Sequence, residues 1–271
     1  MKAFDCRTID IAPTISQMLK IPMFPSTGQL IKEIEALSSG KACKRVVLII
    51  VDSLGYSIFM RLSNIMWNLQ ALARAGVLLK CVSPATYTSP AIASIFTGYL
   101  PEEHRIFSTG DIYTEREKNP ESPKLRSIME WACLAGLKAS VVIESKGAES
   151  FRGRIKEFYG VPDSEDILDY DQKITACAVQ ALQKESELLA VHLRALDRFS
   201  HRAKNWAELK TAAEEIDKNL GEIFRSAGKG TMFLICGDHA IHGWKKWLEN
   251  ATTEEIQNHK ENLVALIAGC C

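Results

Sequence analysis

Short apolar runs alternate along the chain with segments in which apolar residues recur every three to four positions. The short runs have the composition of strands that are buried on both faces of a sheet. They cover residues 45–51, 77–82, 139–143, 188–193, 231–236 and 263–268. These runs predict the strands of a buried, mainly parallel sheet.

The segments between the runs predict helices. Helical spacing of apolar residues fills residues 64–75, 125–135, 172–184 and 207–225. Strands that alternate with helices in this way predict an α/β fold, a three-layer α/β/α sandwich with a mainly parallel central sheet. The length of 271 residues fits one large domain over residues 1–271. Residues 105–123 and 146–171 combine Gly, Pro, Ser and charge, and we expect them to form surface loops or a small lid.

Polar residues follow three of the expected strands. Asp52 comes directly after the first run, Asp197 closely follows the fourth, and Asp238 with His239 follows the fifth. In open α/β sheets the carboxyl ends of the strands form the edge at which ligands collect. We therefore expect carboxylates from three strands to converge at one edge.

Converging carboxylates repel one another unless a positive charge lies among them. His201 lies four residues after Asp197, which places both side chains on one face of a helical turn. Asp238 and His239 offer an oxygen and a nitrogen ligand from one tight turn. Taken singly, each pair also fits a solvated turn. Their joint position after buried strands favours a metal site.

Thr88 stands at the expected start of a short apolar helix. A helix that begins near Ser89 and Pro90 would direct free backbone N–H groups and the positive end of its dipole at whatever the Thr88 hydroxyl attacks, which favours an anionic ester such as a phosphate. A helix cap is the simple alternative, because Thr is common at helix starts. The metal-type residues nearby favour an activated nucleophile.

Charge and composition narrow the class of protein. Lys plus Arg equals Asp plus Glu at 33 each, so the chain lacks the basic footprint of a nucleic-acid or membrane-surface binder. No apolar run reaches the ~18 residues of a membrane span, and the first residues lack a secretory core. None of the eight cysteines forms a Cys-x-x-Cys motif, so reduced thiols and a cytoplasmic location are expected. The pair Cys270 and Cys271 is expected to be an exposed, oxidation-prone tail, with a regulatory thiol as the alternative.

Longer motifs around these residues resemble the alkaline phosphatase superfamily of metal-dependent phosphoesterases, phosphodiesterases and cofactor-independent phosphoglycerate mutases. Residues 51–55, Val-Asp-Ser-Leu-Gly, are similar to its first metal-binding motif. Residues 86–90, Thr-Tyr-Thr-Ser-Pro, are similar to the nucleophile motif of its nucleotide pyrophosphatase branch. Residues 237–240, Gly-Asp-His-Ala, stand where the family has Ser-Asp-His-Gly, and residues 259–267 resemble the last ligand histidine of the mutases followed by a buried strand. The likeness spans nearly the whole chain and implies a single alkaline-phosphatase-like catalytic domain.

Carried over position by position, the resemblance implies two divalent metal ions. One would be held by Asp197, His201 and His259, and the other by Asp52, Asp238, His239 and the Thr88 oxygen. Mixed oxygen and nitrogen ligands suit zinc, with manganese as the alternative. One metal would hold Thr88 as an alkoxide, while the other would withdraw charge from the leaving group and later activate water. A covalent phospho-threonine intermediate follows from this resemblance.

Several residues near the proposed metal ligands can be interpreted in more than one way. His242 competes with His259 as a ligand, and we favour His259 because a strand follows it. Arg194 and Arg198 either clamp the substrate phosphate or are solvated. His192 alternates with apolar residues on a strand and is expected to be a hydrogen-bonded core residue.

The N-terminal segment suggests a rearranged chain. Residues 9–22 and 28–31 resemble the Asp-x-x-Pro-Thr helix and Gly-containing hairpin that normally lie near the C-terminus of the family. We interpret this order as a circular permutation, in which residues 1–33 complete the C-terminal side of the domain. An ordinary N-terminal helix with Pro13 in its first turn is the alternative. A structure in which residues 8–22 lie far from the strand at 263–268 would contradict the permutation.

Together these features predict a two-metal hydrolase of phosphate esters. A phosphodiester or pyrophosphate is favoured over a monoester, because the motif around Thr88 is similar to the diesterase branch. The expected partner is a small-molecule phosphate ester or nucleotide, while its identity and the oligomeric state stay open. A phosphomutase of the same superfamily is the enzymatic alternative, and a non-catalytic module that binds a metal or nucleotide is the alternative from another class.

Overall fold

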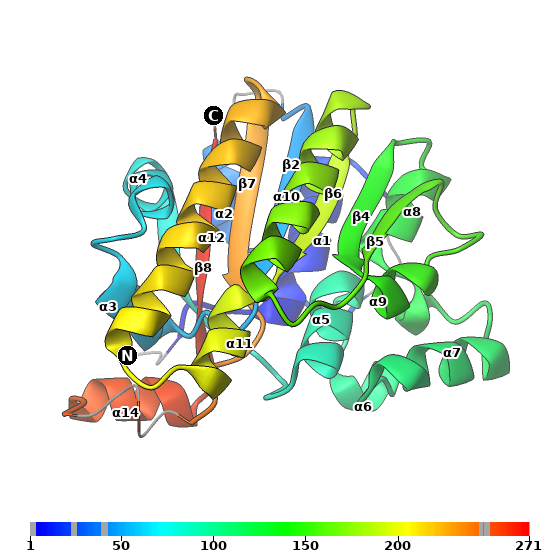
Figure 1. The fold of residues 1–271 in the computed structure, drawn as a ribbon. Coiled ribbons are helices and arrows are strands. Elements are labelled where there is room, and N and C mark those ends of the chain that lie inside the picture. The colour runs from blue at the N-terminus through cyan, green and yellow to red at the C-terminus, as the bar shows by residue number, and fades with distance from the viewer. Residues whose placement is uncertain (1–3, 23–25, 39–42, 244–245, 247–249, 271) are drawn as a thin grey trace.

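The computed structural model describes residues 4–22, 26–38, 43–243, 246 and 250–270. Its centre is an eight-stranded sheet with the order β1-β3-β8-β7-β2-β6-β4-β5 (Figure 1). The strands are β1 (Cys6–Arg7), β2 (Arg45–Val51), β3 (Val77–Val82), β4 (Ala139–Glu144), β5 (Glu157–Val161), β6 (Leu188–Leu193), β7 (Thr231–Gly237) and β8 (Leu263–Cys270). Strand β8 runs antiparallel to β3 and β7, and the other neighbouring pairs are parallel.

Helices cover both faces of the sheet (Figure 1). On one face lie α3 (Tyr56–Leu62), α4 (Trp67–Ala75), α10 (Ile167–Gln183), α11 (Ala195–Arg202) and α12 (Trp206–Ala227). On the other lie α1 (Ile11–Met18), α2 (Lys32–Ser38), α5 (Thr88–Thr97), α8 (Ile128–Leu134) and α9 (Ser145–Glu149). The remaining described helices are α6 (Pro101–His104), α7 (Thr109–Lys118) and α14 (Thr253–Lys260), with short 3-10 turns at Thr8–Asp10 and Pro123–Leu125.

The continuous apolar runs have a direct cause in this arrangement. On β2, Val47 and Ile49 pack into the core beneath α10 and α12, while Val46 and Leu48 pack into the core beneath α1 and α5. Successive side chains of a strand point to opposite faces, so a strand covered on both faces must be apolar at every position. The three-layer α/β/α fold predicted from the sequence is confirmed.

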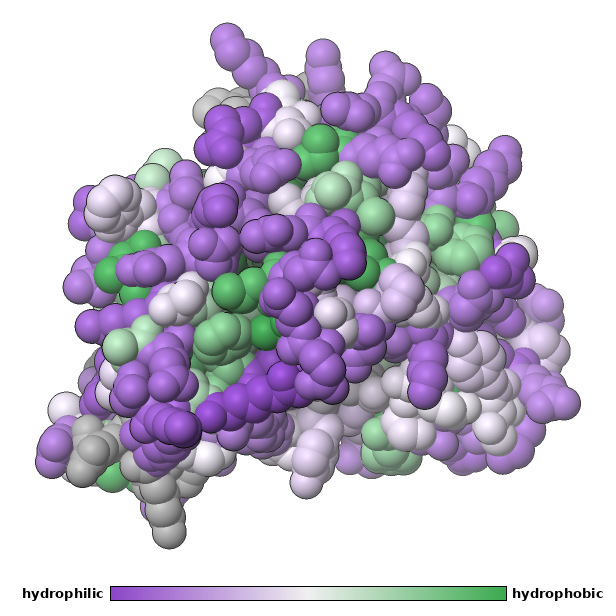
Figure 2. All heavy atoms as spheres, in the orientation of Figure 1, coloured by the Kyte–Doolittle hydropathy of each residue, from purple (hydrophilic) through white to green (hydrophobic). Residues whose placement is uncertain are grey.

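The outer surface of the α10 and α12 layer is mostly hydrophilic. Figure 2 shows polar side chains over most of this face, with hydrophobic ones visible only in small groups between them. Within the described ranges, no helix has both the length and the apolar composition needed to cross a membrane.

The N-terminal segment packs beside β8. Strand β1 pairs with β3, the neighbour of β8, and Ile11 and Ile15 of α1 share one apolar core with Leu266. Asp10 joins the two parts of the segment, because its carboxylate accepts hydrogen bonds from the backbone of Arg7 and Gln29, each at 2.8 Å. This placement meets the condition set for the circular permutation, which itself stays a prediction.

A steric constraint explains why glycine stands at position 28. A Cβ at Gly28 would lie 2.0 Å from the carbonyl oxygen of Ile9, so the segment around residue 28 can approach the N-terminal turn only with glycine there. Thr14 completes the contact, since its hydroxyl donates to the Asp10 carbonyl at 2.6 Å and accepts from the Ile31 amide at 3.0 Å. Asp10 and Thr14 of the Asp-x-x-Pro-Thr sequence thus hold the N-terminal helix to the segment at residues 28–31.

The two stretches expected as loops or a small lid contain regular structure. Residues 105–123 include α7, whose start is capped by Asp111 accepting from the Ser108 amide at 2.7 Å. Residues 146–171 include most of α9, the edge strand β5 and the start of α10. Their weak periodicity reflects exposure, since α7 buries no residue and β5 lies at the end of the sheet.

No disulfide joins any two of the cysteines that the structure describes. Cys6, Cys81 and Cys236 are buried, and burial raises the pKa of the thiols of Cys81 and Cys236 well above the usual value. Cys270 is exposed as expected, but it is the last residue of strand β8 and pairs with Met232, so it does not belong to a tail; Cys271 lies outside the described residues.

Candidate active site

The parallel register of the central strands brings their carboxyl ends to one edge. Val51 at the end of β2 pairs with Leu193 of β6 on one side and with Gly237 of β7 on the other. Asp52 and Asp238 therefore follow neighbouring strands at the same height. This geometry brings together the strand-end residues that the sequence analysis singled out.

Four side chains, Asp52, Thr88, Asp238 and His239, form what we call the buried cluster. The Nε2 atom of His239 lies 3.3 Å from Asp52 Oδ1, 3.6 Å from Asp238 Oδ2 and 3.4 Å from Thr88 Oγ1. Asp52, Asp238 and His239 are each at most 1% exposed. Three oxygens from three different segments thus surround one nitrogen, a donor set typical of a zinc or manganese ion.

The hydrogen bonds of the buried cluster leave two carboxylate oxygens without an aligned partner. Asp238 Oδ1 accepts from the amides of Ser53 at 3.0 Å and His239 at 2.9 Å, but Asp238 Oδ2 and Asp52 Oδ1 accept no hydrogen bond from the described residues. Buried charged oxygens rarely stay unpaired, because their desolvation is costly. The two oxygens face the same space and fit a bound cation.

The charges of the cluster are strongly coupled. Burial raises the pKa of Asp238 to about 7, helped by repulsion from Asp52. Burial alone would also raise the pKa of Asp52, but the imidazoles of His192 and His239 hold it below its usual range. Burial opposes protonation of His239, yet Asp238 and Asp52 raise its pKa to about 10. The site therefore favours a positive charge at the position of the His239 ring.

Thr88 is a first-turn residue of α5 rather than its cap. The N-cap of α5 is Tyr87, and the Thr88 hydroxyl points to His239. The simple alternative of a capping threonine is therefore wrong, because the helix begins one residue earlier than the Ser89–Pro90 start expected from the sequence. The dipole of α5 still has its positive end at the Thr88 hydroxyl.

A second group, Asp197, His201 and His242, forms what we call the open cluster. Each offers a ligand atom within 4.8 Å of the others. Asp197 Oδ1 lies 3.4 Å from His201 Nε2, and the rings of His201 and His242 are 5.3 Å apart. The His201 side chain is 54% exposed, whereas Asp197 and His242 are half-buried, so this cluster is open to solvent at His201.

His259, which the sequence analysis favoured over His242, lies on α14 and is half-buried. Burial lowers its pKa, and the neighbouring His242 lowers it further. The groups of potential ligand atoms among the described residues include His242 and not His259. The geometry therefore favours His242, while a role for His259 stays a prediction.

Ser53 connects the two clusters. Its hydroxyl donates to Asp197 Oδ1 at 2.7 Å, and its amide donates to Asp238 Oδ1 at 3.0 Å. Ser53 adopts a φ of 65°, in the left-handed region that is unfavourable for residues other than Gly, Asn and Asp. The sequence analysis did not single it out, although its position directly after Asp52 was a signal.

Asn262 holds two loops of the site together. Its amide nitrogen donates to the carbonyls of Ser83 at 3.0 Å and Ala85 at 2.6 Å, and its oxygen accepts from the Ala240 amide at 2.8 Å. The first loop leads to Thr88, and the second follows His239. One buried carboxamide therefore sets the distance between the loop that precedes Thr88 and the loop that follows His239.

His192 differs from the hydrogen-bonded core residue expected from its strand. It is buried, its Nε2 lies 3.4 Å from Asp52 Oδ2, and neither ring nitrogen has an aligned hydrogen bond within the described ranges. His192 is in register with Ile50, two residues before Asp52. The alternation along β6 indicates that His192 is buried, but it does not identify Asp52 as its neighbour. His192 belongs to the edge of the site.

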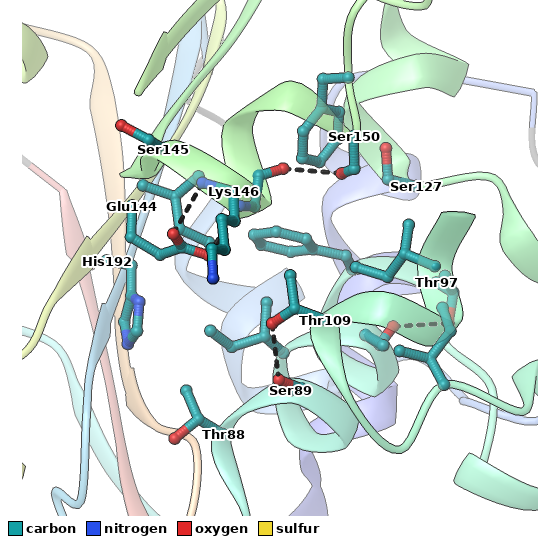
Figure 3. Close-up of a pocket in the computed structure, with 18 of the residues that line it drawn as sticks. Thr88, Ser89, Thr97, Thr109, Ser127, Glu144, Ser145, Lys146, Ser150 and His192 are labelled. Atoms are coloured by element: carbon teal, nitrogen blue, oxygen red, sulfur yellow. Dashed lines mark hydrogen bonds between the residues drawn. The ribbon is translucent and has the colours of Figure 1, made fainter. Parts of the chain in front are cut away.

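A cavity of about 600 Å³ adjoins Thr88 and His192 (Figure 3). It extends between α5, α7 and α9, and its walls include Lys146 and Arg194. Both Arg194 and Arg198 form ion pairs with Asp163, at 3.3 and 3.1 Å, so neither is simply solvated. Any clamping of a phosphate by these arginines would compete with Asp163.

A family model matches most of the chain. The sequence model of type I phosphodiesterases and nucleotide pyrophosphatases matches residues 46–264. The chain therefore belongs to the type I phosphodiesterase / nucleotide pyrophosphatase family, in line with the resemblance to the alkaline phosphatase superfamily.

A curated relative is the 2,3-bisphosphoglycerate-independent phosphoglycerate mutase of Metallosphaera sedula, 30% identical over 147 residues. The match covers 54% of this chain and 32% of the mutase, so the chain matches only about a third of that relative's length.

Solved structures share the fold at low sequence identity. An alkaline phosphatase superfamily protein from Vibrio parahaemolyticus has a TM-score of 0.58 at 13% identity, with 99% of this chain and 71% of that chain covered. Phosphonoacetate hydrolase from Sinorhizobium meliloti 1021 has a TM-score of 0.55 at 16% identity, with 74% and 57% covered. These likenesses confirm the alkaline-phosphatase-like fold.

Proposed function

We propose that the chain is a metal-dependent hydrolase that cleaves phosphate esters, with phosphodiesters or pyrophosphates favoured over monoesters, and that Thr88 is its nucleophile. The observation that carries this proposal is the convergence of the Thr88 hydroxyl with Asp52, Asp238 and His239, two of whose carboxylate oxygens have no aligned hydrogen bond within the described part of the chain. Membership of a phosphodiesterase family supports the same reaction class.

Two divalent cations, zinc or manganese, fit the donor atoms of the two clusters. The buried cluster would hold one through Asp52, Asp238, His239 and Thr88. The open cluster would hold the other through Asp197 and His201, with His242 favoured by geometry and His259 by the sequence resemblance. When bound, such ions lower the pKa of hydroxyl groups and water and stabilise charge on phosphoryl oxygens.

The proposed reaction has two steps, attack by Thr88 on phosphorus and hydrolysis of the phospho-threonine. The Thr88 hydroxyl loses its proton to solvent, its oxygen forms a bond to phosphorus, and the bond from phosphorus to the leaving oxygen breaks. The departing alcohol takes a proton from solvent, and water then cleaves the phospho-threonine bond and restores the hydroxyl. The N-terminus of α5 faces the developing negative charge, and the Lys146 ammonium, which forms no ion pair with a described residue, supplies a positive charge in the adjoining cavity.

The decisive experiment compares Thr88→Ala with Thr88→Ser. Hydrolysis of bis-p-nitrophenyl phosphate and p-nitrophenyl phosphate is followed with zinc, with manganese and with a chelator. We expect Thr88→Ala to abolish turnover but retain most bound metal, and Thr88→Ser to retain measurable turnover. Wild-type rates for Thr88→Ala would rule out Thr88 as the nucleophile, and turnover that persists in chelator would rule out the metal requirement.

A phosphomutase is the second candidate, because a curated relative is a phosphoglycerate mutase. In that reaction the phosphoryl group on Thr88 would pass to another hydroxyl of the substrate instead of to water. Incubation with 3-phosphoglycerate separates the two, since a mutase yields 2-phosphoglycerate and a hydrolase yields inorganic phosphate. Bound metal with neither product from any ester would favour the non-catalytic binding module.

A further inference from the structure

The cavity beside Thr88 is elongated along α5. Its wall includes residues from both ends of this helix, from Thr88 and Ser89 to Phe96 and Thr97. An α-helix rises 1.5 Å per residue, so the nine steps from Thr88 to Thr97 correspond to about 13 Å. The cavity therefore leads away from the nucleophile for the length of an extended organic group.

Polar and apolar residues both line this cavity, but apolar atoms make up most of its exposed surface. Besides α5, the neighbouring segments contribute Ile106, Ile112, Leu125, Ile143 and Phe151. Ala93 on α5 forms a small buried cluster with Ile106 and Leu125, against which Ile112 of α7 packs. This cluster lies apart from the two main cores and forms one side of the cavity.

Most hydroxyl groups on the wall already have partners within the protein (Figure 3). Ser89 and Thr109 bond to each other at 3.2 Å, and Thr97 donates to the Ala93 carbonyl at 2.7 Å. Ser150 donates to the Gly147 carbonyl at 2.7 Å, and Ser127 donates to Glu130 at 2.8 Å. A nucleoside would need free donors and acceptors for its sugar and base, and these walls offer few.

The charged residues of the wall are also largely paired. Arg116 donates to Glu130 at 2.7 Å and to the Leu125 carbonyl at 3.0 Å, although its Nε has no partner within the described ranges. Glu144 accepts from the amides of Lys146 and Gly147, each at 2.7 Å. Figure 3 shows the Lys146 side chain extending into the cavity above Thr88. A phosphate near Thr88 could therefore meet a cation while the rest of the ligand meets apolar walls.

We infer that this cavity binds an extended apolar ester group of the substrate, so that the preferred substrate is a phosphodiester with an alkyl chain rather than a nucleotide. The inference rests on the proposed function and names the substrate class of the same site. Each methylene buried along α5 contributes to binding through the hydrophobic effect.

The test uses p-nitrophenyl phosphodiesters whose second ester group is methyl, butyl or octyl, together with the p-nitrophenyl ester of thymidine 5′-phosphate. We expect kcat/KM to rise by up to about fourfold per methylene until the cavity is filled. The octyl ester should exceed the thymidine ester. Equal values for methyl and octyl, or a preference for thymidine, would overturn the inference while leaving the hydrolase intact. Loss of all turnover with every ester and metal would instead contradict the proposed function.

A matched pair of variants locates the binding site. Ala93→Leu adds volume halfway along the cavity and should lower the octyl-to-methyl ratio of kcat/KM by about tenfold or more. Leu134→Ala, on the exposed side of α8, is the control and should leave the ratio unchanged. If Ala93→Leu does not fold, inhibition of the wild-type protein gives the same answer: octylphosphonate should bind more tightly than methylphosphonate, and equal inhibition would overturn the inference.

Discussion

The two clusters of potential metal ligands differ in how the fold positions them. Asp52 and Asp238 directly follow adjacent parallel strands and are almost fully buried. Asp197 and His201 lie on the short helix α11, and His242 lies on the connection after β7, with His201 largely exposed. The buried cluster is preorganised by the sheet, whereas the open cluster depends on a helix and a connection.

This difference shows that one part of the site is rigid and the other is accessible to solvent. The buried cluster can hold the proposed nucleophile, Thr88, in a fixed position, because its other members follow strand ends in a low-dielectric environment. The open cluster is open to solvent at His201, which in the proposed reaction would let a leaving group depart and water enter. Ser53 contacts both clusters, through Asp238 and His239 on one side and Asp197 on the other, so a change in one cluster can reach the other.

The largest expected effect comes from removing a carboxylate of the buried cluster. Asp238→Ala should lower kcat/KM by about 10³-fold or more, and Asp197→Ala by about 10²-fold, because a charge acts more strongly where water is excluded. The measurement is hydrolysis of bis-p-nitrophenyl phosphate at saturating metal. Asp169→Ala, which removes a carboxylate paired with Lys173 on α10, is the control and should retain full activity. Equal losses for Asp238 and Asp197 would show that the clusters do not differ in this way.

The next comparison identifies the third ligand of the open cluster. His242→Ala should remove about one metal ion per chain and lower turnover by roughly 10- to 100-fold, while His259→Ala should keep both ions. Metal content is measured on the purified variants by mass spectrometry. The opposite result would establish His259, the ligand implied by the sequence resemblance.

The link through Ser53 gives a smaller effect. Its φ of 65° costs about 1 kcal/mol or more for a residue with a Cβ, so Ser53→Gly should be more stable than Ser53→Ala by about 1 kcal/mol. Urea unfolding of the metal-free variants measures this difference. Both variants lose the hydrogen bond to Asp197 and should weaken metal binding at the open cluster to a similar extent. A more stable Ala variant would mean that the backbone there is not strained.

The smallest expected effect concerns α14, which carries His259. The Arg61 guanidinium, 2.6 Å away, lowers the pKa of Glu255 to about 2. A carboxyl group whose folded pKa is depressed contributes stability above its unfolded pKa near 4.3, and this contribution is lost as the pH falls toward 2. Since the pair is partly solvated, it contributes at most about 1 kcal/mol.

Urea unfolding at pH 6.5 and pH 3.5 checks this contribution. Wild type should lose more stability between the two values than Glu255→Gln, whose side chain does not titrate. Identical losses would show that the ion pair with Arg61 does not anchor α14.

The sequence predicted the central sheet well because burial on both faces leaves an unmistakable apolar run. The observed β2, β3 and β6 have the predicted bounds, and β4, β7 and β8 extend one or two residues further. Strand β5 escaped prediction because an edge strand such as Glu157–Val161 is covered only in part, and β1 because it has two residues.

The site shows a similar division. Asp52, Asp238 and His239 were predictable, since polar residues that directly follow buried parallel strands have a defined place at the carboxyl edge of the sheet. His192 was not, because alternation along a strand reports burial and not what the side chain faces. The cavity was also beyond reach, since its walls come from segments between Thr88 and Arg194 that meet only in the folded chain.

Strand β8 runs against its neighbours, so it enters the sheet at the edge where β7 leaves it. The described parts of the connection between them, residues 238–243, 246 and 250–262, therefore start and end at this same edge of the sheet. Its length can change without disturbing the strand register, as is common for surface connections. Both competing histidines, His242 and His259, lie on it. In evolution, a change confined to the part of this connection after His239 could therefore exchange one proposed metal ligand, and with it the access to the site, while Asp52, Asp238 and His239 stay in place.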